Sequence, residues 1–307
     1  MGNKNYLAEL YGLEEITAKN ISITKNNKGH LIYEIENKEF LDTDEKSKAL
    51  YEDWERFLKR KLPDFTFVNK GDCEITATYN KTFILSADYI GPSKAWAAKA
   101  FDAKYKNMGK VEEKLADILN VCRRFEGYMI WPKSQNININ SHDGQNSVFG
   151  ISYGKGGKST VNMCRGGTMG VYDRFDITLY SLKKYFELFI ENKKKEYSGN
   201  VLYRRAEEFI ASCGGKIDII KNGFRLFNLF LAFELSYEWF EIFETFDRFV
   251  QVFELQDFIE NGEPVIWCSE DKIAELFDSG SSYQNYIKYV KGCTDAIKSR
   301  GKAFRDF

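Results

Sequence analysis

The sequence is poor in the residues that usually build metal sites and flexible linkers. Its 307 residues include only two histidines, His30 and His142, and four prolines. Two imidazoles are too few for a multi-histidine metal site, so we expect no metal to be bound in that way. Proline-rich disordered segments are not expected either.

Cysteine is present but is not arranged in a metal or disulfide pattern. The six cysteines are scattered, and no two form a C-x-x-C pair. They are Cys73, Cys122, Cys164, Cys213, Cys268 and Cys293. Reduced thiols are the usual state of such cysteines in the cytosol, so we predict a cytoplasmic protein without structural disulfides.

Long apolar runs and an excess of charge of one sign are also missing. Residues 1–10 are polar and charged, and no run approaches the roughly 18 apolar residues of a membrane span, so we expect neither a signal peptide nor a membrane. Lys and Arg number 44 against 45 Asp and Glu, giving a net charge of -1. A dedicated nucleic-acid coat would normally be basic, so this balance argues against one.

Aromatic residues, by contrast, are abundant. Phe, Tyr and Trp make up 16% of the chain, and 43% of all residues are hydrophobic, which is enough for a sizeable core. Many of the aromatics in residues 217–259 recur at intervals of three or four, which predicts helices buried on more than one side. The alternative is an aromatic face that docks a partner protein.

The pattern of elements predicts an α+β fold. Residues 20–25 and 30–36 read as strands joined by a hairpin turn, and residues 42–62 read as one helix capped by Thr43 or Asp44. We predict a β-containing N-terminal lobe over residues 1–105 and a mainly helical, aromatic-rich part over residues 106–307. Further strands are expected at 127–131 and 159–162, in one sheet, and further helices at 110–125, 200–213 and 283–299.

The stretch from Ser159 to Phe186 carries the densest polar motif. A short strand leads into three glycines within five positions, which allow positive φ and close backbone approach. Asp173 then fits a helix N-cap, with Asp176 at the third helical position as in a capping box. The sequence therefore predicts a strand, a glycine turn and a capped helix.

Two interpretations of this motif stay open. In the first, Arg165 and the amides of Gly166 and Gly167 cradle an anion, and Asp173, Arg174 and Asp176 orient it or move a proton. Asp173 and Asp176 are then the catalytic candidates, as a base or as ligands of Mg²⁺. In the second, the same residues form a buried ion-pair network that joins the turn to its helix.

Three segments resemble an uncharacterised prokaryotic family, the domain of unknown function DUF6994, over roughly residues 80–300. Its Thr-Ile-Asn-x-x-Arg-Gly pattern is met by Thr160, Val161, Asn162, Arg165 and Gly166, and its Asp-Arg-Phe-Asp start of a helix by residues 173–176. An aromatic helix at 237–240 leads to Leu255, Gln256 and Asp257, as in the family. A terminal helix ending near Arg300 is similar too.

The resemblance implies a shared site rather than an activity, because the family has no established function. It implies that seven polar residues gather in space as ligand-binding or catalytic candidates. They are Asn162, Arg165, Asp173, Arg174, Asp176, Gln256 and Asp257. No cofactor is implied.

Two function classes are compatible with these features. The first is a protein-binding module or inhibitor without chemistry, for instance a prokaryotic or phage protein that blocks an anti-phage defence system such as Gabija. The second is an enzyme or sensor that acts on a phosphate-bearing nucleotide or nucleic-acid end through Arg165, Asp173 and Asp176, with Mg²⁺ as the cofactor. The poverty in histidine and the near-zero charge favour the first class, with another protein or a second copy of the chain as partner.

Overall fold

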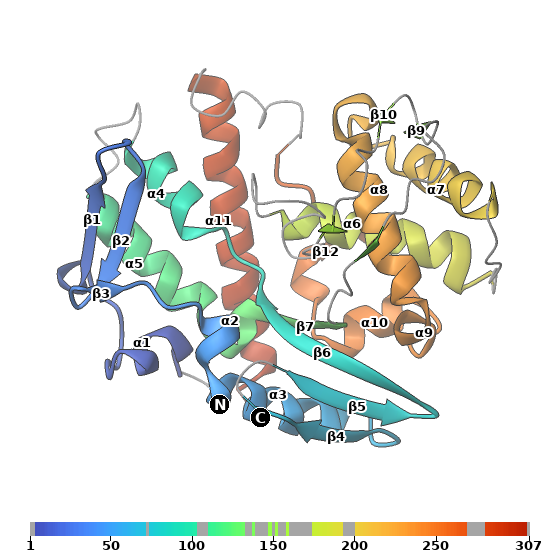
Figure 1. Cartoon of the computed structure of the whole chain (residues 1–307), viewed down its shortest axis with the longest axis horizontal. Helices are drawn as coiled ribbons and strands as arrows, with labels where there is room; N and C mark the ends of the chain where they lie inside the picture. The colour runs from blue at the N-terminus through green and yellow to red at the C-terminus, as the bar shows by residue number, and fades with distance from the viewer. Residues whose placement is uncertain are drawn as a thin grey trace. The chain divides into compact units, whose positions relative to one another are not determined.

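The computed structural model describes residues 4–71, 74–102, 110–132, 137–138, 147–148, 151–152, 158–159, 174–192, 200–268 and 280–305. Its contacts divide the chain into two compact units, Met1–Pro132 with Phe277–Phe307, and Lys133–Leu276. The predicted α+β fold is confirmed, with the longer strands in the N-terminal part and mainly helices after it (Figure 1). The first unit runs from Met1 to Pro132 and also contains the last helix of the chain. The domain boundary predicted near residue 105 remains a prediction.

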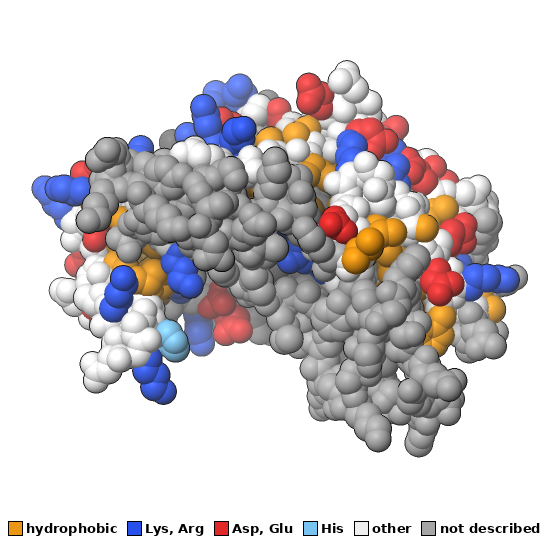
Figure 2. All heavy atoms as spheres, turned by 90° about the horizontal axis from the view of Figure 1, so that it is seen from above, with side chains coloured by type: hydrophobic (Ala, Val, Ile, Leu, Met, Phe, Trp, Pro, Cys, Tyr) orange, Lys and Arg blue, Asp and Glu red, His pale blue; other side chains and the backbone are white. Residues whose placement is uncertain are grey.

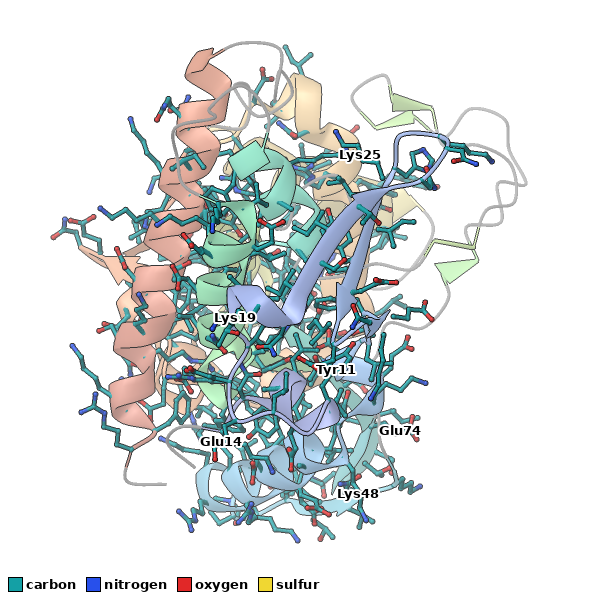
Figure 3. The ribbon with its side chains drawn as sticks, turned by 90° about the vertical axis from the view of Figure 1, so that its left-hand side faces the viewer. Tyr11, Glu14, Lys19, Lys25, Lys48 and Glu74 are labelled. Carbon is teal, nitrogen blue, oxygen red and sulfur yellow. The ribbon has the colours of Figure 1, made fainter. Side chains whose placement is uncertain are left out.

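One sheet of the first unit has three antiparallel strands. Strands β1 (Ile21–Lys25) and β2 (Leu31–Ile35) pair with Ile21 opposite Ile35, and β3 (Lys38–Glu39) adds to β2. The predicted turn is present, and its Asn26 side chain accepts from the amides of Lys28 and His30. Figure 3 shows Lys25 near the tip of this hairpin and Tyr11 near its base.

The same unit contains a second sheet, of four antiparallel strands. Its strands are β4 (Thr66–Asn69), β5 (Ile75–Tyr79), β6 (Lys81–Tyr89) and β7 (Tyr128–Pro132), in that order. One face is apolar and buried, through Phe67, Ile75, Ala77, Leu85 and Ala87. This alternation is typical of an antiparallel sheet with one face on the core.

The helix predicted over residues 42–62 is two helices, α2 (Thr43–Lys46) and α3 (Lys48–Lys61). Ser47 between them is extended, with φ -96° and ψ 95°, and its hydroxyl accepts from the amide of Leu50 as the cap of α3. Asp42 caps α2 instead of Thr43 or Asp44. The capping preference of Ser47 therefore outweighs the helical spacing of apolar residues that continues across it from residue 42 to residue 62.

Helices pack beside these sheets within the first unit. They are α1 (Tyr6–Leu10), α4 (Lys94–Asp102), α5 (Val111–Cys122) and α11 (Gly280–Ala303), with 3₁₀ turns at Ala18–Asn20 and Phe125–Gly127. Helix α11 runs alongside α4 and α5 (Figure 1). Its buried Arg300 donates to the carbonyl oxygens of Glu126 and Tyr128 at 2.7 and 2.8 Å, which joins α11 to the start of β7.

The second unit is mainly helical among its described residues. Its helices are α6 (Phe175–Tyr185), α7 (Asn200–Cys213), α8 (Ile219–Leu235), α9 (Tyr237–Glu241) and α10 (Phe246–Val252). Helix α6 continues as a π-helical turn, Phe186–Ile190, and a 3₁₀ turn spans Gln256–Phe258. The helix predicted over 200–213 is therefore confirmed.

Strands in this unit are short pairs. They are β8 (Ile137–Asn138) with β11 (Lys158–Ser159), β9 (Ser147–Val148) with β10 (Ile151–Ser152), and β12 (Ile259–Glu260) with β13 (Glu263–Pro264). The expectation that residues 127–131 and 159–162 share one sheet is wrong for the described part of the second stretch. Lys158 and Ser159 pair with β8, while 160–162 lie outside the described residues.

The aromatic stretch forms the core of the second unit, as predicted. Most of its aromatic side chains are buried, and they meet largely edge to face around Tyr185 and Phe240. The members with no exposed surface include Phe230, Phe233, Trp239, Phe240, Phe243, Phe249 and Phe253. Edge-to-face contacts suit the quadrupoles of the rings. These side chains are therefore not an external docking face.

Candidate functional site

The start of α6 is the described part of the motif predicted from the sequence. Asn162, Arg165, Gly166, Gly167 and Asp173 lie outside the described residues. Arg174 and Asp176 lie within them, and both are completely buried. The geometry of the predicted site is therefore given by these two residues and their neighbours.

Arg174 and Asp176 form a two-pronged ion pair. Arg174 Nε donates to Asp176 Oδ1 at 2.8 Å, and Arg174 Nη2 donates to Asp176 Oδ2 at 3.0 Å. The same Nη2 donates to the carbonyl oxygen of Cys268 at 2.8 Å. A planar guanidinium matches a carboxylate in this way, so the pair is geometrically well defined.

Asp176 also accepts two backbone hydrogen bonds. The amide of Ile177 lies 2.9 Å from Oδ1, and the amide of Trp267 lies 3.3 Å from Oδ2. The pair thus joins the first turn of α6 to the segment after β13, about ninety residues later in the chain. With four donors on its two oxygens and no exposed surface, this carboxylate is poorly placed to act as a base or a metal ligand.

The helix begins differently from the prediction. Arg174, with φ -129° and ψ 75°, occupies the N-cap position, and Asp176 is the second helical residue rather than the third. The side chain of Arg174 makes no capping hydrogen bond. Instead Asp176 satisfies the amide of Ile177 from inside the first turn, where a negative charge also suits the helix dipole.

Gln256 and Asp257 lie on the 3₁₀ turn before β12, and both are exposed. The turn is held against the start of α6, because the rings of Phe258 and Phe175 meet edge to face at 5.1 Å. The structure therefore brings the two segments together but leaves Gln256 and Asp257 on the surface. A site shared with Asn162, Arg165 and Asp173 remains a prediction.

A second buried ion pair lies in the same unit and was not predicted. Glu234 on α8 accepts from the hydroxyl of Tyr185 at 2.7 Å and from Arg205 Nη2 on α7. The Arg205 guanidinium also covers the ring of Phe189 at 4.0 Å, within the π-helical turn. This cluster connects α6, α7 and α8. No spacing in the sequence marks it, because its members come from three separate helices.

A candidate metal site and a membrane-spanning helix are both absent from the described ranges. There, no three His, Cys, Asp or Glu side chains gather in a way that could hold a metal ion. Among the described helices, none combines the length and the apolar character needed to cross a bilayer. Four cysteines are described, namely Cys122, Cys213, Cys268 and Cys293, and all four are buried free thiols.

Comparison with known proteins adds a family match. The model of a family of unknown function, DUF6994, matches residues 228–304, which run from α8 to the end of α11. The predicted resemblance is confirmed over these residues, which include Gln256 and Asp257, whereas the motif around Arg165 and Arg174 precedes them. No curated protein and no solved structure matches the chain.

Proposed function

We propose that the protein is a non-enzymatic binding module or inhibitor whose partner is another protein. The observation that carries this proposal is an exposed patch without charged side chains on strands β4, β5 and β6. In the register of β4, β5 and β6, Val68 lies opposite Thr76, and Thr76 lies opposite Ile84. Val68 and Ile84 are each 48% exposed.

A second row of the same kind lies beside the first. Thr66 pairs with Thr78, and Thr78 pairs with Thr82, on the same side of the three strands. All six side chains are β-branched and none is charged. Such side chains favour the strand conformation by themselves, but apolar groups as exposed as Val68 and Ile84 are also typical of protein-binding surfaces.

The geometry at α6 supports the same choice. An enzyme acting on a phosphate group would use Asp176 as a base or a Mg²⁺ ligand, and this carboxylate is occupied by Arg174 and two backbone amides. In the face of the molecule shown in Figure 2, basic and acidic side chains are interspersed among the described residues, without a broad area of one sign. The overall balance of 44 Lys and Arg against 45 Asp and Glu also argues against a dedicated nucleic-acid coat.

The finer proposal is a prokaryotic or phage protein that acts in the cytoplasm against an anti-phage defence system. Its support is compositional, namely the near-zero net charge and the poverty in histidine. Co-expression with a Gabija system during phage infection tests it. Phage growth should be restored by the wild-type protein, and unchanged growth would reject this role.

The binding proposal is tested by placing charge on the sheet face. The double variant Val68→Lys and Ile84→Lys should lose a protein partner that the tagged wild type retains in a pull-down analysed by mass spectrometry. Ile220→Lys is the matched control, because Ile220 is an 87% exposed apolar residue on α8 in the other unit. Retention of a nucleotide with no protein partner would instead favour an enzyme or sensor.

A further inference from the structure

The outer edge of β1 carries backbone groups that its own sheet does not use. β1 is the end strand in the order β1-β2-β3, so it pairs with a strand on one side only. It lies at the margin of the first unit in Figure 1, and Figure 3 shows it on the near side, between Lys19 and Lys25. Its last two residues, Thr24 and Lys25, are exposed. We call the side of the strand that faces away from β2 the β1 edge.

The register of the hairpin decides which backbone groups point toward this edge. The amide of Asn26 donates to the carbonyl oxygen of His30, and the amide of Glu36 donates to that of Asn20, both at 2.9 Å. These pairs continue the register of β1 with β2 at its two ends. Hydrogen-bonded pairs occur at every second residue of an antiparallel ladder, so the even-numbered residues of β1 bond to β2. The N–H and C=O groups of the odd-numbered residues, with Ile23 at the centre, therefore point away from β2.

Ile23 has both of its outward backbone groups unused. Within the described ranges, neither its N–H nor its C=O makes a hydrogen bond. The N–H of Ile21 is used, because it donates to the carbonyl oxygen of Ala18 in the 3₁₀ turn before the strand. β1 contains no proline, and its register with β2 runs from residue 21 to residue 25 without a bulge. An edge without these protective devices is a template for a further strand.

The β1 edge is complementary to itself. When two copies of β1 meet antiparallel about a two-fold axis at Ile23, the N–H of this residue in each copy faces the C=O of the same residue in the other. Two hydrogen bonds then form across the axis. In the hairpin Ile23 lies opposite Tyr33, so the two Ile23 side chains join two such pairs into one row without charge.

The other pairs of this register are compatible as well. Ile21 of each copy lies opposite Lys25 of the other, so the two lysines do not face each other. Ser22 lies opposite Thr24, and hydroxyl side chains can hydrogen-bond across neighbouring strands. A register centred on Lys25 would place like charges together, and one centred on Ile21 would need an N–H that the 3₁₀ turn already uses. Ile23 is therefore the favoured centre.

We propose that the partner of the β1 edge is a second copy of this chain, joined through an antiparallel β1–β1 pair centred on Ile23. The two three-stranded sheets then form one continuous sheet, in the order β3-β2-β1-β1-β2-β3. The main-chain hydrogen bonds of the added strand supply affinity, and the side chains beside them set the register. This self-association uses a different sheet from the exposed patch on β4, β5 and β6 and does not depend on the function proposed above.

Analytical ultracentrifugation of the full chain, over a range of protein concentrations, tests the proposal. The wild type should show an equilibrium between monomer and dimer. Ile23→Pro removes an N–H that the hairpin does not use, and an edge strand tolerates proline at such a position. Both central hydrogen bonds of the dimer are lost, so the dissociation constant should rise roughly tenfold or more. Circular dichroism and a thermal melt establish that the variant is folded.

The variants Ile23→Lys and Ile23→Glu give a second, independent test. Each places like charges opposite each other across the axis, so each alone should be monomeric where the wild type is a dimer. An equal mixture of the two should form a dimer again, because the facing charges then differ in sign. The double variant Val68→Lys and Ile84→Lys is the control, since it adds charge to the other sheet and should leave the dimer unchanged.

A wild type that stays monomeric at every concentration would overturn the proposal. A dimer that Ile23→Pro and Ile23→Lys leave at full strength would overturn it too, as would charged variants that do not pair when mixed. If the wild type instead retained a different protein in a pull-down and Ile23→Pro lost it, the β1 edge would belong to that partner and self-association would be rejected.

Discussion

Breaking the ion pair at the start of α6 is the perturbation whose consequence the structure defines best. Arg174→Met removes the guanidinium and keeps a long apolar side chain. Asp176 then loses two charge-assisted donors, and the carbonyl of Cys268 loses one donor. The carboxylate stays buried with only the amides of Ile177 and Trp267.

The expected loss of stability is large relative to the total. Removing one partner of a buried ion pair leaves an uncompensated charge and costs about 3–5 kcal/mol. Single domains are stable by roughly 5–15 kcal/mol, so Arg174→Met removes about a third or more of a typical value. Arg174→Met with Asp176→Leu should lose less than the two single variants added together, by up to about 3 kcal/mol.

Urea unfolding followed by tryptophan fluorescence measures these differences. Arg248→Met is the matched control, because Arg248 pairs with Glu244 at 3.6 Å with both side chains more than half exposed. An exposed pair typically contributes about 0.2–1 kcal/mol. A loss below about 1 kcal/mol for Arg174→Met, or strictly additive single and double variants, would refute the structural role of the pair.

Three further predictions follow from buried groups. Trp239→Ala and Phe243→Ala should each reduce the free energy of unfolding in urea by about 3–5 kcal/mol, because both side chains have no exposed surface; losses below about 1 kcal/mol would contradict a core position. The raised pKa of Asp44 means that the folded state binds its proton more tightly, so this contribution to stability is full below the unfolded pKa and is lost as pH rises through the folded pKa. Asp44→Asn should therefore gain stability relative to wild type between pH 4 and neutrality, and parallel pH curves would disprove this. Burial raises the pKa of Cys122 and of Cys213 to about 12, so a thiol reagent at pH 8 should leave both unmodified in the native protein, as peptide mass spectrometry can check.

Much of the fold follows from local sequence signals. The hairpin around Asn26 and Gly29 and the helix at 200–213 were predictable because turn residues and apolar spacing act over a few neighbouring positions. The buried character of residues 217–259 followed likewise from a spacing that leaves apolar side chains on several sides of each helix. Competition between two local signals explains the error over 42–62, where Ser47 divides the predicted helix.

The partners of the polar residues were decided by the tertiary structure alone. The sequence predicted that Arg174 and Asp176 lie at the start of a helix and left open whether they bind a ligand or each other. Their pairing with the backbone of Trp267 and Cys268 depends on a segment about ninety residues away. The ion pair of Asp44 with Arg123 likewise joins residues that are about eighty positions apart. Local propensity carries no information about such contacts, because they arise only when packing brings distant elements together and removes their polar groups from water.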